Sequence, residues 1–200
     1  SLVQDGKFAQ ATELLKNSQP LTRLRSAVDR SQKGGWTWLL LGPLPNVDRQ
    51  PFDQPLINET SIPDFSQALP GINGEPTGWH KILTYAGTLD FEDFYPDKAE
   101  HTVSYAALRV ISKNEKNVVL SLGSDDGAKV WINGGLVHEN HAQRGAARGQ
   151  EKIPLRLRQG ENLLLFKVDN VVGGYQLLVD FLNQDGSPDK SLEIAAPELK

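Results

Sequence analysis

The chain has 200 residues, of which 38% are hydrophobic and 23% are charged, as is ordinary for one globular domain with or without an appendage. Its 21 basic and 25 acidic residues give a formal net charge of −4, so no basic excess favours nucleic acid or an anionic membrane as a partner. Cysteine is absent, which excludes disulfides, thiol catalysis and thiolate metal ligands.

No apolar run approaches the roughly 20 residues that a membrane helix needs. The sequence also has no methionine, not even a first one. We therefore expect a fragment or a processed chain, whose lack of a leader peptide is uninformative.

Residues 1–33 differ from the rest, and we expect a helical hairpin there, before a second domain at residues 34–200. Apolar residues of the first part recur at helical spacing: Phe8, Ala11, Leu14 and Leu15. Pro20 suits the first turn of a second short helix. The stretch GKFAQATELLKN is similar to a helix of a tetratricopeptide repeat. Two interpretations stay open: the pair ends a helical repeat region, or it packs on the following domain.

After Gly35 the periodicity changes from that of helices to that of strands. The run WTWLLLG at 36–42 predicts a buried strand, whereas 43–78 contains seven prolines and is expected to wrap the surface without regular structure. Further strands are expected near residues 79–84, 102–112, 117–123, 128–133, 136–138, 152–157, 161–169 and 175–182. Short strands separated by turns predict a mainly β fold, an antiparallel β-sandwich of jelly-roll type.

Three turns carry specific signals. Asn133-Gly134 is a two-residue hairpin signal, because the turn requires positive φ at both positions. Gln159-Gly160 and Gly173-Gly174 mark two more turns. The continuous apolar run LLLF at 163–166 predicts a central strand that is buried on both faces.

These motifs, in this order, resemble a galactose-binding-like jelly-roll module. The matching pieces are Trp38 to Pro45, Tyr105-Ala106, Leu122 to Val137, Arg144, Leu157 to Val168 and Gly173 to Tyr175. The resemblance covers about residues 36 to 186. Such modules occur beside enzymes in large bacterial extracytoplasmic proteins, so the resemblance implies a carbohydrate-binding-like accessory domain outside the cytoplasm, periplasmic or secreted.

The run SDDGAKVWING is also similar to the lectin-like domain named after the anthrax protective antigen. In the sugar-binding members of that family two adjacent aspartates hold a calcium ion, which suggests Asp125 and Asp126 as metal ligands here. Calcium needs six to eight oxygens, so other loops must help, and the family's remaining ligands do not align with this chain. The interpretation we favour is a structural corner at Ser124-Asp125-Asp126-Gly127, in which the carboxylates accept backbone N–H bonds and Gly127 takes a positive φ.

Four side chains flank the same hairpin and are the candidate glycan ligands: Trp131, His138, Arg144 and Tyr175. They would supply one stacking platform and a few polar anchors. The alternatives are that Trp131 packs beneath the 43–78 segment and that Arg144 pairs with Asp125 or Asp126 in a solvated loop. His138 and His141 are three residues apart without an evident third ligand, so zinc is not expected.

Catalytic motifs are missing: there is no G-x-S-x-G elbow, no H-E-x-x-H and no phosphate loop. The expected function is therefore a noncatalytic carbohydrate-binding-like accessory module of a larger bacterial protein, with a glycan and the parent chain's other domains as partners. The alternative is a structural or interaction domain that orients a neighbouring enzyme and binds no glycan. No cofactor is expected, apart from calcium if Asp125 and Asp126 are metal ligands.

Overall fold

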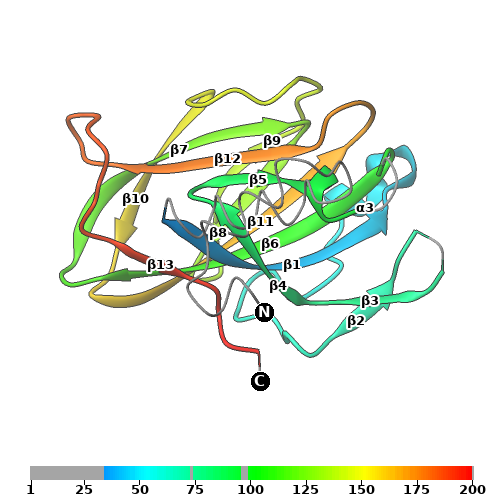
Figure 1. Ribbon diagram of the computed structural model, residues 1–200, viewed down its shortest axis with the longest axis horizontal. Coiled ribbons are helices and arrows are strands. Elements are labelled where there is room, and N and C mark those ends of the chain that lie inside the picture. The colour runs from blue at the N-terminus through cyan, green and yellow to red at the C-terminus, as the bar shows by residue number, and fades with distance from the viewer. Residues whose placement is uncertain (1–33, 73, 96–98, 200) are drawn as a thin grey trace, which may run out of the picture.

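The computed structural model describes residues 34–72, 74–95 and 99–199, which form a mainly β domain (Figure 1). The expected helical pair at residues 1–33 lies outside the described residues, and its packing stays a prediction. In chain order the strands are β1 (Gly35–Pro45), β2 (Ala68–Pro70), β3 (Pro76–Gly78), β4 (His80–Tyr85), β5 (Thr88–Asp90), β6 (Thr102–Ser112), β7 (Lys116–Asp125), β8 (Ala128–Ile132), β9 (Gly135–Asn140), β10 (Glu151–Leu157), β11 (Gly160–Asn170), β12 (Gln176–Leu182) and β13 (Glu193–Ala195).

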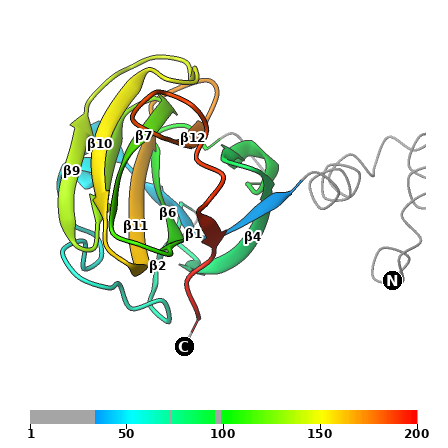
Figure 2. The ribbon, with the colours of Figure 1, turned by 90° about the vertical axis from the view of Figure 1, so that its left-hand side faces the viewer.

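All but two of these strands belong to one large antiparallel sheet. Its order is β10-β7-β12-β5-β4-β1-β6-β11-β8-β9, and β13 pairs with the far end of β6. Only one residue pair, Tyr85 with Thr88, joins β4 to β5, so the sheet turns a corner there. The two ends of the order, β10 and β9, come together again, so the sheet nearly closes into a flattened barrel (Figure 2).

The inner core fills the space between the two layers that this corner creates. One layer supplies Val118, Leu120, Leu122, Ile153, Leu155, Leu157, Leu177, Val179 and Phe181. The other supplies Trp38, Leu40, Ala106, Leu108, Val110, Ala128, Val130, Leu164, Phe166 and Val168. These residues alternate along their strands with residues of the opposite face, as the period of two in a strand requires.

A second apolar cluster, the outer cluster, lies on the other face of β1, β6, β8 and β11. Its sheet residues are Leu39, Leu41, Val103, Tyr105, Ala107, Trp131 and Leu165. The segment between β1 and β4 covers them with Leu56, Phe65 and Leu69, which are partly buried, and with Phe52, Ile57 and Trp79, which are buried. The central strands are therefore buried on both faces, which confirms the expectation for the LLLF run in β11.

A buried ammonium group fixes the covering segment to the sheet. Lys167 on β11 donates from Nζ to the carbonyl of Gln54 at 2.6 Å and to Glu59 Oε1 at 3.0 Å. Tyr105 on β6 donates its hydroxyl to the same Glu59 oxygen. Burial lowers the pKa of Lys167 while the Glu59 carboxylate opposes that shift. The ion pair ties a loop to two strands that lie more than forty residues away in sequence.

The segment 43–78 is less irregular than its prolines suggested. It contains a 3₁₀ turn η2 (Val47–Arg49), a one-turn helix α3 (Gln50–Asp53) and the ribbon β2–β3. Pro51 stands at the start of α3, where a missing N–H costs nothing, and Pro70 and Pro76 end the ribbon. The sequence signal for these elements is weak because none is longer than four residues.

The turns follow the prediction closely. Asn133 and Gly134 have φ values of 51° and 85°, and they connect β8 to β9. Gly160 and Gly173 also have positive φ, at 86° and 90°. Among the described residues, no helix is long and apolar enough to cross a membrane.

Replacing Trp131 by alanine should lower the free energy of unfolding by about 3–5 kcal/mol, because it empties a buried site between β8 and the covering segment. Urea denaturation would measure this loss. Leu136→Ala is the control: Leu136 lies on β9 and is 51% exposed, so its loss should cost no more than about 0.5 kcal/mol. Equal losses of unfolding free energy for the two substitutions would contradict the burial of Trp131 in the outer cluster.

Candidate functional site

The loops at one end of the sandwich gather four carboxylates, which we call the acidic end: Asp90, Glu92, Asp125 and Asp126. Asp125 ends β7, and Asp90 ends β5 just before the 3₁₀ turn η3 (Phe91–Asp93). Gln176, the first residue of β12, pairs in register with both Asp90 and Asp125, and its amide donates to Asp90 Oδ2 at 2.7 Å. The strand order therefore brings together carboxylates that are more than thirty residues apart.

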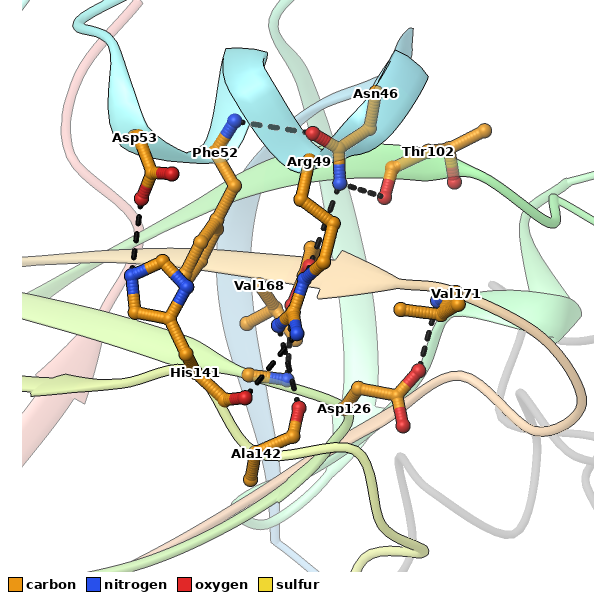
Figure 3. Close-up of polar contacts among 12 residues, drawn as sticks. Asn46, Arg49, Phe52, Asp53, Thr102, Asp126, His141, Ala142, Val168 and Val171 are labelled. Carbon is orange, nitrogen blue, oxygen red and sulfur yellow. Dashed lines mark hydrogen bonds and ion pairs between the residues drawn. The ribbon is translucent and has the colours of Figure 1, made fainter.

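Beside the acidic end, the Arg49 guanidinium reaches the carbonyls of His141 and Ala142 (Figure 3) and binds the buried carboxylate of Asp169 on β11. Its Nε lies 2.7 Å from Asp169 Oδ2 and its Nη2 lies 3.1 Å from Oδ1, so the contact is bidentate. The same guanidinium donates to the carbonyls of His141 and Ala142, while the Gly127 N–H and the Asn46 amide also donate to Asp169. Burial raises the pKa of Asp169 and Arg49 opposes the rise.

Arg49 holds an uncommon backbone conformation to make these contacts. Asp48 and Arg49 have φ values of 51° and 60°, which non-glycine residues adopt only rarely. The guanidinium contacts offset that local cost, and they fasten η2 and α3 to both β11 and the β9–β10 loop.

Asp126 is a structural acceptor, as the favoured interpretation of the aspartate pair predicted. Its Oδ1 accepts the N–H of Arg144 at 2.8 Å, and its Oδ2 accepts the N–H of Val171 at 2.8 Å. The side chain is buried, so each bond satisfies a donor that water does not reach freely. One carboxylate thus joins the corner between β7 and β8 to the loops after β9 and β11.

The expectation that Gly127 takes a positive φ is wrong, although glycine is required at this position for another reason. Gly127 does not have a positive φ; instead a Cβ there would lie 2.7 Å from the Asn140 carbonyl, 2.7 Å from Asp169 Oδ1 and 2.8 Å from Arg49 Nη2. Close packing around the Arg49–Asp169 pair therefore requires glycine at this position, and the turn itself does not.

Asp125 has a different environment from its neighbour. Burial, followed by the charge of Asp126, raises the pKa of Asp125 to about 6, and Glu92 and Asp90 add to the rise. A hydrogen bond from the Ala146 N–H opposes these effects. Three like charges and one N–H donor thus surround a half-buried carboxylate, an arrangement that favours either a proton or a cation.

Oxygen ligands for a calcium ion are present at this end. The described residues offer the Asp125 and Asp126 carboxylates, and Asn170 Oδ1, which is buried without a hydrogen-bond partner. Asn170 directly precedes the N–H that binds Asp126. Carboxylate and amide oxygens are among the ligand types that calcium prefers, so these residues are of the chemical class that such an ion takes.

Two of the four predicted glycan ligands are buried, which corrects the expectation that they converge at a surface. Trp131 is 5% exposed and belongs to the outer cluster, beneath the 43–78 segment, as the alternative interpretation held. Tyr175 is 1% exposed, stacks on Phe91 at 4.1 Å between ring centroids and donates its hydroxyl to the Val168 carbonyl. The sequence left both environments open for Trp131, and the packing of the covering segment decides for the buried one.

His138 and Arg144 do come together, around Glu151 on β10. Arg144 Nη2 lies 3.0 Å from Glu151 Oε1, so its guanidinium pairs with Glu151 and its backbone, not its side chain, binds Asp126. Burial lowers the pKa of His138, while the charge of Glu151 opposes the shift. A role for His138 and Arg144 in glycan binding stays a prediction.

An exposed group of Asp53, Glu139 and His141 lies at the edge of this region. His141 Nε2 is 2.9 Å from Asp53 and 3.4 Å from Glu139. Lys129 Nζ lies 2.8 Å from Glu139 and 3.6 Å from Asp53, so a cation already balances the two carboxylates. His138 does not belong to this group.

No protein-family model matches the chain, and no curated protein sequence matches it. Among solved structures it is similar to a β-glucosidase from Kluyveromyces marxianus, with 12% identity and a TM-score of 0.45 over 60% of this chain. The chain spans only 16% of the length of that enzyme.

Two further solved structures are similar over most of their length. The PA14 domain of the MpAFP antifreeze protein has 11% identity and a TM-score of 0.44, over 84% of this chain and 95% of that domain. The epithelial adhesin 9 A domain of Candida glabrata, solved with Galβ1-4GlcNAc, has 11% identity and a TM-score of 0.45, over 80% of this chain and 84% of that domain. These likenesses are too distant to assign a family or a ligand.

Replacing Arg49 by alanine should lower the free energy of unfolding by about 3 kcal/mol, because it leaves the buried Asp169 carboxylate without its cation. Arg49→Lys should recover only part of the loss, since an ammonium cannot reproduce the bidentate contact. Chemical denaturation would measure both. The control is Arg156→Ala, which breaks an exposed pair with Glu115 and should cost about 0–1 kcal/mol.

Asp125→Asn should stabilise the protein increasingly as pH rises from about 4 to about 7, with no further change above that range. The raised pKa, about 6 against an ordinary 3.8, means that the folded state binds the proton more tightly, so ionisation of Asp125 costs stability in this window. Urea denaturation across pH would measure the difference between variant and wild type.

Asp185→Asn serves as the control for this pH dependence. Hydrogen bonds from Ser187 lower the pKa of Asp185 below its ordinary 3.8, so its ionised form is stabilising and the effect of Asp185→Asn on stability should stay constant from pH 4 to pH 7. If the difference in unfolding free energy between Asp125→Asn and wild type did not change from pH 4 to pH 7, the pKa of Asp125 would not be raised by the neighbouring carboxylates of the acidic end.

Proposed function

We propose that this chain is a noncatalytic carbohydrate-binding module of the galactose-binding-like jelly-roll class, working outside the cytoplasm as part of a larger bacterial protein. The observation that carries the proposal is the half-buried Asp125 carboxylate, which is surrounded by like charges and lies beside Asp126. Binding proteins concentrate charged oxygen ligands in loops that a rigid sheet positions, and the acidic end has this construction.

We infer that a calcium ion is the group for this end, because carboxylate and amide oxygens are the ligand types that calcium prefers. Asp125 and Asp126 would hold it, with Asn170 Oδ1 as a neutral ligand. The two backbone bonds of Asp126 leave further lone pairs on its oxygens, since each carboxylate oxygen accepts more than one contact. When bound, the ion would coordinate vicinal hydroxyls of a sugar and neutralise the repulsion around Asp125.

The protein's own residues provide the rigidity of the site. Arg49 fixes the loop after β9 through the carbonyls of His141 and Ala142. The Gln150 side chain accepts a hydrogen bond from the Ser124 N–H at 3.0 Å and donates one to the Gly145 carbonyl at 2.8 Å. The loop that donates to both aspartates is thus held at several points before any ligand arrives, which lowers the entropy cost of binding.

The second candidate function is a structural or interaction domain that binds no glycan. It is favoured by the burial of Trp131 and Tyr175, which removes two aromatic faces from the surface, and by the backbone bonds that Asp126 already makes.

Thermal melts in EDTA and in calcium separate the two functions. If the acidic end binds calcium, the wild-type melting temperature should rise by several degrees, since an ion at about 100 times its Kd adds about 2.7 kcal/mol. Asp125→Asn should abolish the rise and Asp185→Asn should retain it, because Asp185 is an exposed loop residue outside the acidic end. A glycan array in the two buffers should then show calcium-dependent signals. Identical melts and a blank array would support the structural domain.

A further inference from the structure

The other end of the sandwich carries a groove of about 920 Å³. Three strands show that it lies opposite the acidic end. β6 runs from Thr102 toward Arg109, β8 runs from Ala128 toward Asn133, and β11 begins beside Leu163 and ends at Asn170. Arg109, Asn133 and Leu163 line the groove, together with the 60–65 segment and Pro197.

The walls of this groove are fixed by contacts within the protein. The Asn133 side chain accepts the Leu163 N–H at 3.0 Å and donates to Asn162 Oδ1 at 3.1 Å. Gly134 packs against the 60–65 segment so closely that a Cβ would lie 2.2 Å from the Thr60 carbonyl oxygen. The groove is therefore formed before any ligand binds, as is usual for small-molecule sites.

Its chemistry combines apolar walls with a rim of planar polar groups. Phe65, Leu163 and Pro197 supply apolar surface. Arg109 Nη1 lies 2.9 Å from Glu161, and its Nε is buried with no hydrogen-bond partner among the described residues. The volume lies within the range of about 300–1,000 Å³ that is typical of ligand sites.

The charges of the rim indicate a neutral ligand. Two guanidinium groups, Arg109 and Arg158, face three carboxylates, Asp64, Glu161 and Glu198, so neither an anion nor a cation meets a field of one sign. A peptide bound as an added strand is disfavoured, because the N–H and C=O of Leu163 already bond to Asn133. A sugar has apolar C–H faces, which suit the apolar walls, and hydroxyls that both donate and accept hydrogen bonds, which suit the polar rim.

We propose that this groove is a second glycan-binding site, which takes a neutral saccharide and needs no calcium. The inference rests on the proposed carbohydrate-binding function for its class of ligand, but on none of the residues of the acidic end. The two sites would lie at opposite ends of the same long strands.

The test uses the full chain labelled with ¹⁵N and titrated in EDTA with maltotetraose, cellotetraose and β-1,4-galactotetraose as neutral probes. At least one probe should shift the amide signals of residues 60–65, Asn133 and Leu163. Ser61→Trp, which places a bulky ring on the exposed wall, should weaken that binding at least tenfold. Arg158→Ala should weaken it severalfold.

Arg156→Ala is the matched control, since Arg156 is an exposed arginine on the strand that ends beside Arg158 but does not line the groove. It should leave the probe's affinity unchanged, and thermal melts would show that all three variants fold.

The outcomes distinguish this site from the acidic end. Groove shifts that persist in EDTA support the second site even if calcium has no effect on stability. Shifts that appear only at residues 125–127 and 141–150, and only with calcium, overturn the groove and leave the proposed function intact. Absence of any shift with these probes in either buffer overturns the groove proposal, as does an apolar peptide binding there in place of the sugars.

Discussion

A buried carboxylate that must be neutralised organises this domain. Asp169 lies at the end of β11 with its side chain out of water, and burial of a charge is tolerated only where a counterion and hydrogen bonds surround it. Arg49 supplies the counterion from a segment 120 residues earlier in the chain. Its remaining donors then reach the loop after β9, so one electrostatic requirement determines where three loops lie. The close packing around that pair also explains the glycine at position 127.

The sequence was most informative where local rules dominate. Short apolar or alternating runs bounded by turn residues predicted nine strand positions, and Asn133-Gly134 predicted its hairpin, because strand pattern and turn φ depend on near neighbours. Arg49 and Asp169 escaped prediction because nothing in either neighbourhood marks them as partners across such a separation. Trp131 had two possible environments in the sequence, a surface sugar platform or the space beneath the 43–78 segment, and a strand's period alone could not decide between them. The proline-rich 43–78 segment covers Trp131, and a sandwich thereby acquires a second apolar layer.

The acidic end was only partly visible in the sequence. The adjacency of Asp125 and Asp126 predicted either a metal site or a tight corner, and Asp126 has the structural role that a tight corner requires. The crowding around Asp125 depends on Asp90 and Glu92, which β12 brings close by pairing with both β5 and β7. One aspartate of the pair therefore maintains the fold, while the other retains charge that the fold does not neutralise. That division separates the structural role of Asp126 from the binding role that we propose for Asp125.

The position of β12 has a consequence for how the protein is made. This strand is among the last in the chain, yet it lies between β7 and β5, inside the first layer. Until residues 176–182 leave the ribosome, both neighbouring strands expose unpaired backbone edges and the inner core lacks Leu177, Val179 and Phe181. Pairings of such long sequence separation form slowly, and open strand edges invite association with other chains. The earlier hairpins alone therefore leave strand edges open, and the barrel can close only after this late strand has emerged.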